Sequence, residues 1–216
     1  MICPAGLLLA TVLVGPVTAA TPEAVGRVQA WLDSWSRLSG RFEQRLQSPT
    51  LPSTQVETGR FHVAQPDRMR WDYRQPERKL AVTDGVQTWL YVPSDRQVIR
   101  GTIDQLKRDS AASMLLSGAL RLEEAFVIQA SSVEDTATWL GLTPRDPSEA
   151  IQSIRLQVLT ETGQILGFEV VDPAGNRVTW LFDEVRLDPE IDEDLFVFRV
   201  PHGVEVQDLE AAGSTP

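Results

Sequence analysis

This sequence of 216 residues has very few of the side chains that carry out covalent or metal chemistry. It contains one cysteine, Cys3, and two histidines, His62 and His202. A zinc site needs three or four ligands, so here it would have to be built largely from carboxylates. A glycine-rich phosphate loop and a Gly-x-Ser-x-Gly nucleophile elbow are also missing. We therefore expect no enzyme of these classes, no metal and no cofactor.

Basic charge is scarce as well. The chain carries 20 Lys and Arg against 30 Asp and Glu, a net charge of -10. A nucleic-acid-binding protein needs a dominant basic face, so we expect no nucleic-acid partner. The charge is uneven: residues 60–108 hold 10 basic and 6 acidic side chains, and residues 109–216 hold 6 and 20. Either this polarity serves only solubility, or different ends dock on different partners, with 60–108 as one candidate docking face.

Long apolar runs are limited to the N-terminus, where the chain reads "MICPAGLLLATVLVGPVTAA". The apolar centre spans residues 7–14, a Gly-Pro break follows, and small residues end the run. It is too short to span a bilayer and is typical of a secretory signal, although the usual basic start is missing. We expect residues 1–20 to be cleaved, residues 21–209 to form one domain, and residues 210–216 to be a flexible tail. A short anchor or a buried strand is the alternative for the N-terminal run.

Helical periodicity occurs in two places. In residues 21–40, Thr21 is a plausible N-cap, Pro22 suits the first helical position, and Gly40 closes the pattern. The apolar positions of this helix are Val25, Val28, Leu32, Trp35 and Leu38. Residues 103–126 also have a helical pattern, which we expect Gly118 to divide into two short helices.

Elsewhere the apolar pattern has a period of two, which is typical of strands. We predict strands at 41–47, 56–64, 69–74, 79–83, 87–93, 96–100, 126–130, 151–159, 165–172, 176–183 and 196–200. Asp84-Gly85 and Gly175-Asn176 are expected to form hairpin turns. The sequence therefore predicts a mainly β fold: a single-domain, incomplete and strongly curved antiparallel barrel, with an N-terminal helix and short helices on one side or within its concavity.

The predicted strands are rich in large apolar side chains. The residues expected to project to one side are Phe42, Phe61, Met69, Trp71, Tyr73, Trp89, Tyr91, Phe168, Trp180 and Phe182. A barrel of ten or eleven strands is wider than side chains alone can fill, so either a helix plugs it or it encloses an apolar ligand such as a lipid. A carboxylate-dependent hydrolase is the alternative from a different class, since 30 acids can always supply a pair.

Several motifs in a fixed order resemble a known family. They are "FEQ" at 42–44, Gly59-x-Phe61, "QPDRMRWDY" at 65–73, "LAVTDGVQTWLYVP", "MLLSG", "DPAGN" and "FVFRVPHGVEV". Each motif is weak alone, but their order and spacing over residues 28–206 are similar to those of the outer-membrane lipoprotein carrier proteins (the LolA family) of Gram-negative bacteria.

The resemblance implies a half-barrel whose helices form a lid over a hydrophobic cavity. Such carriers receive acylated lipoproteins from an inner-membrane ABC transporter, shield the acyl chains across the periplasm and deliver them to an outer-membrane receptor. By similarity, this chain would be a periplasmic, monomeric carrier and not an enzyme, with Leu115 and Leu116 on the lid. A periplasmic binding protein or sensor for another lipid is the alternative within the same fold.

One departure from the family concerns the lid. The family usually has an arginine before the proline of "AQPDR", and that arginine ties the lid to the barrel. Here the position is Gln65, a neutral side chain with fewer donors. Either the lid closes less tightly, or Arg68 or Arg70 takes the place of the missing arginine.

Overall fold

The computed structural model describes residues 22–118, 120–134, 136–146 and 151–209. The N-terminal run, the expected N-cap Thr21 and the expected tail lie outside these ranges. The helices are α1 (Pro22–Asp33), α2 (Ile103–Asp109), α3 (Ala111–Leu116), α4 (Leu122–Ala125) and the 3-10 helix η1 (Glu193–Phe196). No helix within the described ranges is long and apolar enough to cross a membrane.

The strands form one sheet. They are β1 (Arg37–Gln47), β2 (Gln55–Ala64), β3 (Arg68–Gln75), β4 (Lys79–Asp84), β5 (Gln87–Val92), β6 (Gln97–Thr102), β7 (Phe126–Glu134), β8 (Ala137–Pro144), β9 (Ser153–Leu159), β10 (Ile165–Val171), β11 (Arg177–Leu187) and β12 (Glu205–Asp208). Their order in the sheet is β12-β6-β5-β4-β3-β2-β1-β11-β10-β9-β8-β7, and each pair is antiparallel except β12 with β6. The predicted mainly β, open and curled sheet is confirmed.

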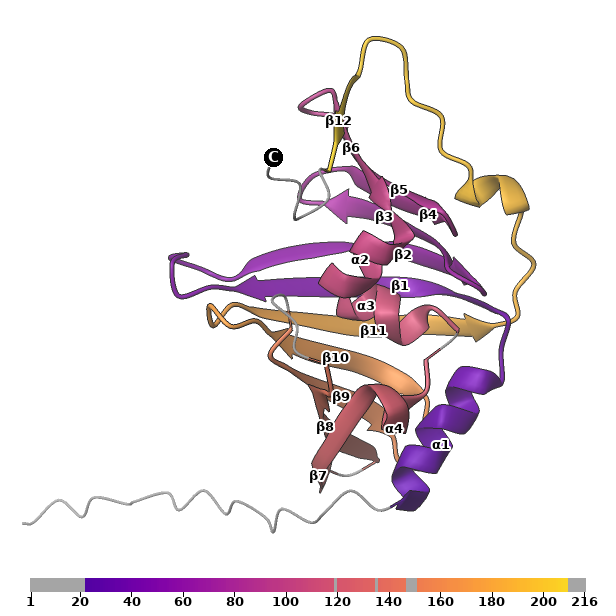
Figure 1. Cartoon of the computed structure of the whole chain (residues 1–216), viewed down its shortest axis with the longest axis vertical. Helices are drawn as coiled ribbons and strands as arrows, with labels where there is room; N and C mark the ends of the chain where they lie inside the picture. Colours follow the sequence, from indigo (N-terminus) through magenta and orange to yellow (C-terminus); the bar gives the residue numbers. More distant parts are fainter. Residues whose placement is uncertain (1–21, 119, 135, 147–150, 210–216) are drawn as a thin grey trace, which may run out of the picture.

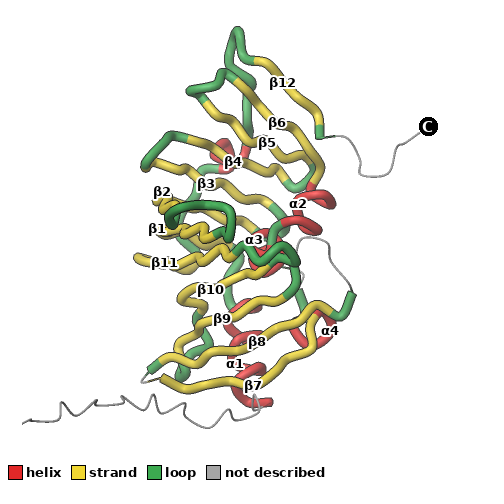
Figure 2. The backbone as a smooth tube through the Cα atoms, turned by 90° about the vertical axis from the view of Figure 1, so that its left-hand side faces the viewer, coloured by secondary structure: helices red, strands yellow, loops and turns green. Residues whose placement is uncertain are grey.

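Two antiparallel meanders meet at the centre of this sheet. Strands β2 to β6 form one half and β7 to β10 form the other, and β1 pairs with both β2 and β11 to join them. The sheet curls along its length, and α2 and α3 lie in front of its middle, with α1 and α4 beside the β7–β10 half (Figures 1 and 2). Buried residues of α1, α3 and α4 belong to the same core as the inward side chains of the strands. The face that these helices cover is the concave face.

A smaller apolar cluster lies on the convex face. Val82, Val98 and Phe196 are buried there, outside the main core. Phe196 and Phe198 come from residues 188–204, which leave β11 and lead to β12; we call this segment the C-terminal strap. In Figure 1 the strap is the gold segment that runs outside the strands. Its aromatic side chains cover the outer side of the β3–β6 half.

Carboxylates attach the start of the strap to the sheet. Asp188 Oδ1 accepts hydrogen bonds from the backbone N–H groups of Ser36 (2.8 Å) and Arg37 (2.9 Å), and these bonds lower the pKa of Asp188. The Glu193 carboxylate pairs with the guanidinium groups of Arg37 and Arg68. Those arginines lower the pKa of Glu193, chiefly through the hydrogen bond from Arg37. The strap is therefore held by ionised carboxylates at its start and by buried aromatic rings further along.

The first helix is shorter than predicted. It ends at Asp33, and Gly40 lies inside β1 instead of closing the helix. The spacing of Trp35 and Leu38 suits a helix, but Leu38 belongs to the strand. The N–H groups of the two residues before it are bound by the distant Asp188, a contact that the local sequence does not reveal. A side chain at Gly40 would meet the Phe61 ring at 2.8 Å, so glycine permits close packing there.

Other boundaries also differ from the predictions. The segment 103–126 contains three short helices, since the chain breaks near Ser110 as well as at Gly118, whose φ is 83°. Strands β8 and β12 are additional to those predicted. The strand predicted at 196–200 is wrong, because Phe196 ends a 3-10 helix and the next residues belong to the strap. The two hairpin turns are confirmed, with φ of 97° at Gly85 and 82° at Gly175.

Candidate functional site

A cluster of aromatic rings forms the middle of the concave face. Phe42 lies with its ring centroid 5.2 Å from Trp71 and 5.3 Å from Trp180, while Phe61 stacks on Trp71 at 5.2 Å. Phe182 lies 5.1 Å from Phe61. These rings come from β1, β2, β3 and β11, which the sheet order places side by side. Offset and edge-to-face contacts of this kind stabilise a packed wall beyond the area that they bury.

The aromatic wall borders a cavity of about 370 Å³. Of the predicted residues, Met69, Trp71, Tyr73, Trp89 and Trp180 border it. Further lining comes from Ala81, Val82, Thr83, Thr88, Leu90, Ile99, Leu106, Ser110 and Leu209. The predicted residues Phe42, Phe61, Phe168, Leu115 and Leu116 are buried in the core that surrounds it, and Phe182 packs against that core. An apolar pocket of this size is within the range of small-molecule sites.

Tyr73 is the main polar group in the wall. Its hydroxyl donates a hydrogen bond to Gln44 Oε1 at 3.0 Å, and Lys79 Nζ lies 4.7 Å from the centre of its ring. Burial raises the pKa of Tyr73, and the negative charge of Glu57 raises it further. The hydroxyl therefore stays protonated and satisfied, which suits a wall residue better than a proton donor or acceptor in catalysis.

Two of the predicted cavity residues have rings on the other face. In the sheet register Trp71 pairs with Ala81, and Ala81 pairs with Leu90, so Leu90 shares the concave face. Trp89 and Tyr91 alternate with Leu90 and point to the convex side. There their ring centroids lie 6.0 and 5.9 Å from that of Phe198 in the C-terminal strap. The expectation that these two rings share a face with Trp71 is wrong, although Trp89 still borders the cavity beside Leu90.

Helices α2 and α3, which we call the lid, cover the cavity. Helix α2 begins at a capping box: Thr102 Oγ1 accepts from Gln105 N, and Gln105 Oε1 accepts from Thr102 N at 2.8 Å. Leu106 of α2 borders the cavity, and Leu115 and Leu116 of α3 are buried in the main core. The lid helices thus occupy part of the concavity themselves.

A turn between β2 and β3 connects the lid to the barrel. Lys107 Nζ of α2 lies 2.8 Å from both carboxylate oxygens of Asp67, and Asp67 N donates to Ser117 O at 3.2 Å. Gln65 Nε2 donates to Leu32 O at the end of α1, at 3.4 Å. The Gln65 side chain also fills the space beside Gly118, where a Cβ atom would lie 2.5 Å from it. Residues 65–67 therefore contact α1, α2 and the end of α3 together.

Among the described residues, the contacts of Arg68 and Arg70 are with the strap and with β3, and none is with the lid. Both lie on the convex face, where Arg68 pairs with Glu193 and its guanidinium lies 5.6 Å from the centre of the Phe196 ring. Arg70 donates to Leu195 O at 3.0 Å and pairs with Asp72. The hypothesis that either arginine ties the lid is wrong. The charged tie is the pair of Asp67 and Lys107, and sequence spacing alone does not bring these two residues together.

The described residues contain no group of three or more His, Cys, Asp or Glu side chains that could hold a metal ion. His62 lies on β2, half-buried, and burial is the main cause that lowers its pKa. It shares the convex face with Arg70, its partner in the register, and so lies away from the cavity. The features on the concave face are an apolar wall, an apolar cavity and a tethered lid.

The sheet, the cavity and the lid together define a class: an open β-barrel with helices over an apolar pocket. The family model described as outer membrane lipoprotein carrier protein LolA matches residues 33–199. The chain therefore belongs to the LolA family.

Individual relatives support this placement. The chain is 28% identical to the outer-membrane lipoprotein carrier protein of Chromohalobacter salexigens, over 93% of this chain and 94% of the relative. It is 31% identical to the protein of the same name from Nitrosomonas europaea, over 85% and 88% of the two chains. Among solved structures, an uncharacterised conserved protein from Thermus thermophilus aligns with a TM-score of 0.53 at 14% identity, covering 87% of this chain and 98% of that one. This structural likeness concerns the fold alone.

Proposed function

We propose that this chain is a periplasmic carrier of lipoproteins that shields their acyl chains in the cavity under the lid. The observation that carries the proposal is the apolar cavity of about 370 Å³ between the aromatic wall and helix α2, in a chain of the LolA family. The relatives are named outer-membrane lipoprotein carrier proteins. We further propose that residues 1–20 are a cleaved secretory signal, that residues 21–209 are the carrier domain and that the carrier is a monomer without enzymatic activity.

The handover of cargo requires that binding is not too strong. Burial of an acyl chain contributes about 0.8 kcal/mol per methylene, so one chain of ~16 carbons would contribute roughly 12 kcal/mol. Two or three chains would exceed the practical ceiling of reversible binding. Leu115 and Leu116 of the lid are buried in the core that surrounds the cavity, so we propose that long acyl chains displace them. This displacement offsets part of the binding energy and permits release.

The proposed partners are those that membership of the LolA family implies. We propose that the carrier receives lipoproteins from an inner-membrane ABC transporter and delivers them to an outer-membrane receptor. The hydrolysis of nucleotide would be performed by the donor, since a phosphate-binding glycine loop is missing from this sequence.

Release of lipoproteins from inner-membrane spheroplasts by the purified mature protein tests this proposal. Trp71→Glu places a charge in the buried wall and should abolish release. Leu90→Gln is a milder change at a half-buried residue elsewhere in the cavity lining, for use if the first variant does not fold. The matched control is Trp139→Glu, because Trp139 lies on β8 against Arg155, 4.7 Å from its ring centre, and not on the cavity.

Mass spectrometry of the ligand that co-purifies with the protein separates the carrier from the alternatives. Acylated lipoprotein in the wild type and its loss in the Trp71 or Leu90 variant support the proposal. Free lipid without lipoprotein, together with no release activity, would indicate a carrier or sensor of another lipid. Normal release by both wall variants would show that the cavity is not the cargo site.

A further inference from the structure

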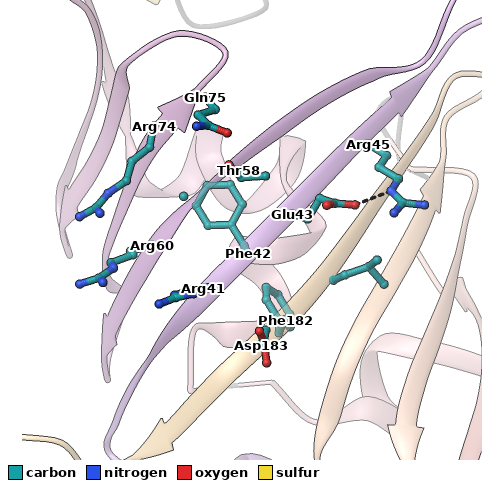
Figure 3. Close-up of a pocket in the computed structure, with 12 residues that line it drawn as sticks. Arg41, Phe42, Glu43, Arg45, Thr58, Arg60, Arg74, Gln75, Phe182 and Asp183 are labelled. Carbon is teal, nitrogen blue, oxygen red and sulfur yellow. Dashed lines mark hydrogen bonds and ion pairs between the residues drawn. The ribbon is translucent and has the colours of Figure 1, made fainter.

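A second hollow lies on the convex face of the sheet, behind the aromatic wall. It is a groove of about 570 Å³ over β1, β2, β3 and β11, and four arginines line it: Arg41, Arg45, Arg60 and Arg74 (Figure 3). Along their strands these arginines alternate with side chains that face the cavity, so the groove and the cavity open on opposite faces. Binding of an acyl chain under the lid makes no use of this groove.

The groove holds positive charge that the fold does not neutralise. Arg41 Nε lies 3.0 Å from a carboxylate oxygen of Glu184, and Arg45 pairs with a neighbouring carboxylate, as the dashed line in Figure 3 shows. Arg60 and Arg74 are exposed and have no ion-pair partner among the described residues. Arg41 and Arg60 also stand directly opposite each other in the β1–β2 register. On their other sides, Arg41 stands opposite Asp183 and Arg60 stands opposite Asp72. The Asp72 carboxylate pairs with Arg70, so the groove's arginines without an ion pair among the described residues are Arg60 and Arg74.

We propose that this groove, the arginine groove, is a docking site for an acidic segment of a partner protein. Guanidinium groups recognise carboxylates through paired hydrogen bonds, and a groove admits an extended segment from a second chain. A flat anionic membrane fits less well, because the whole chain has a net charge of -10 and Glu43 and Asp183 stand among the arginines. An anionic bilayer would be repelled over a wide area, whereas a short segment meets only the local positive charge.

The spacing of the arginines sets the form of the partner segment. Arg60 on β2 stands opposite Asp72, two residues before Arg74 on β3. Arg60 and Arg74 are therefore separated by one strand spacing of about 4.8 Å and one same-face repeat of ~7 Å, which together give roughly 8 Å. In an extended peptide, side chains on the same side repeat every ~7 Å. Acidic residues at alternate positions therefore place carboxylates close to Arg60 and Arg74 at the same time. This inference does not depend on what occupies the cavity on the concave face.

Fluorescence anisotropy with a defined probe tests the inference. The probe is a fluorescein-labelled peptide with four glutamates at alternate positions, and its counterpart carries glutamine at those positions. The wild type should bind the glutamate peptide, more weakly as salt rises, and should not bind the glutamine peptide. Arg60→Gln/Arg74→Gln should weaken binding roughly fivefold to thirtyfold, since two charge pairs are lost. The matched control, Arg96→Gln/Arg199→Gln, removes two exposed arginines outside the groove and should bind as the wild type does.

Several outcomes would overturn the inference. Equal weakening in the control variant would mean that only overall charge matters. Tighter binding to phosphatidylglycerol vesicles than to the peptide, lost in the Arg60/Arg74 variant, would assign the groove to a membrane. Self-association in sedimentation, lost in the same variant, would assign it to a second copy of this chain. Because neither arginine has an ion pair with any residue that the structure describes, the variant should fold and bind fatty acid normally, which separates a failure here from a failure of the carrier function.

Discussion

The ion pair between Lys107 and Asp67 should hold the lid closed. Lys107 Nζ lies 2.8 Å from both carboxylate oxygens, and the two side chains are 32% and 19% exposed. Exposed ion pairs contribute about 0.2–1 kcal/mol, and hydrogen bonds to charged groups contribute about 1.5–3 kcal/mol. For this half-buried pair we take about 1.5 kcal/mol as its contribution to the free energy of lid closure. Lys107→Met should therefore raise the ratio of open to closed lid roughly tenfold.

Binding of a fluorescent fatty acid measures this change. The apparent dissociation constant varies inversely with the fraction of protein whose lid is open, so the affinity should rise by up to about tenfold when the open state is rare. Asp67→Asn should have a similar effect, and the double variant should differ little from either single variant. The matched control is Arg177→Met, because Arg177 pairs with Glu169 and joins β11 to β10, away from the cavity lining and the lid.

Two results would contradict this reasoning. If both single variants fold and bind the fatty acid with the affinity of the wild type, the ion pair does not control the lid. If the effects of the two substitutions add in the double variant, Asp67 and Lys107 act separately and the pair is not the tie.

Three other perturbations follow from the packing and the charges. Gly59→Ala should lower the free energy of unfolding in urea by about 1–3 kcal/mol or more, because the new methyl group would lie 2.1 Å from a backbone oxygen. Gly26→Ala, at an open site on α1, should instead raise the free energy of unfolding by about 0.5–1 kcal/mol. Phe196→Ala should lower the free energy of unfolding by about 3–5 kcal/mol and make the C-terminal strap sensitive to proteases. An unchanged digestion pattern would show that the Phe196 ring does not hold the strap. The pKa values of Asp188 and Glu193 are lowered in the fold, so these carboxylates stabilise the folded state above the ordinary carboxyl pKa range, and this stabilisation is lost as the pH falls below about 4. Amide hydrogen exchange in the strap should therefore become faster below about pH 4 and not near neutral pH.

The sheet was predictable because its signals are local. Alternation along 69–74 and the turn residues Asp84-Gly85 and Gly175-Asn176 specify meanders without reference to the rest of the chain. The end of α1 was not predictable in this way, because Asp188 fixes it from the far end of the sequence. The same holds for the 3-10 helix, since the apolar alternation of 196–200 reflects contact with the convex face and not pairing with another strand.

The cavity wall was predicted well on β3 and poorly on β5. Trp89 and Tyr91 were chosen because they are aromatic, although the hairpin at Gly85 already sets their face. Thr83 pairs with Thr88, so an even number of residues lies between them in the hairpin. With that loop length, Leu90 faces the same side of the sheet as Trp71, and its neighbours Trp89 and Tyr91 face the other side. This signal was available in the sequence. What the sequence could not supply was the reason for two aromatic rings on the outer face, because Phe198 reaches them through the strap.

The central pairing of β1 with β11 has a consequence for the order of folding. Each meander consists of contacts between neighbours in the sequence, which form at a small cost in loop entropy, while Phe42 meets Phe182 only after most of the chain is in place. We expect the two meanders to form early and the central seam to form late. The aromatic wall is built across that seam, and the lid helices belong to the connection between the two meanders. The lining from β3–β6 and α2 would then be in place before Trp180 of β11 completes the pocket, so a chain that is cut before β11 would have a pocket without the wall that Trp180 supplies.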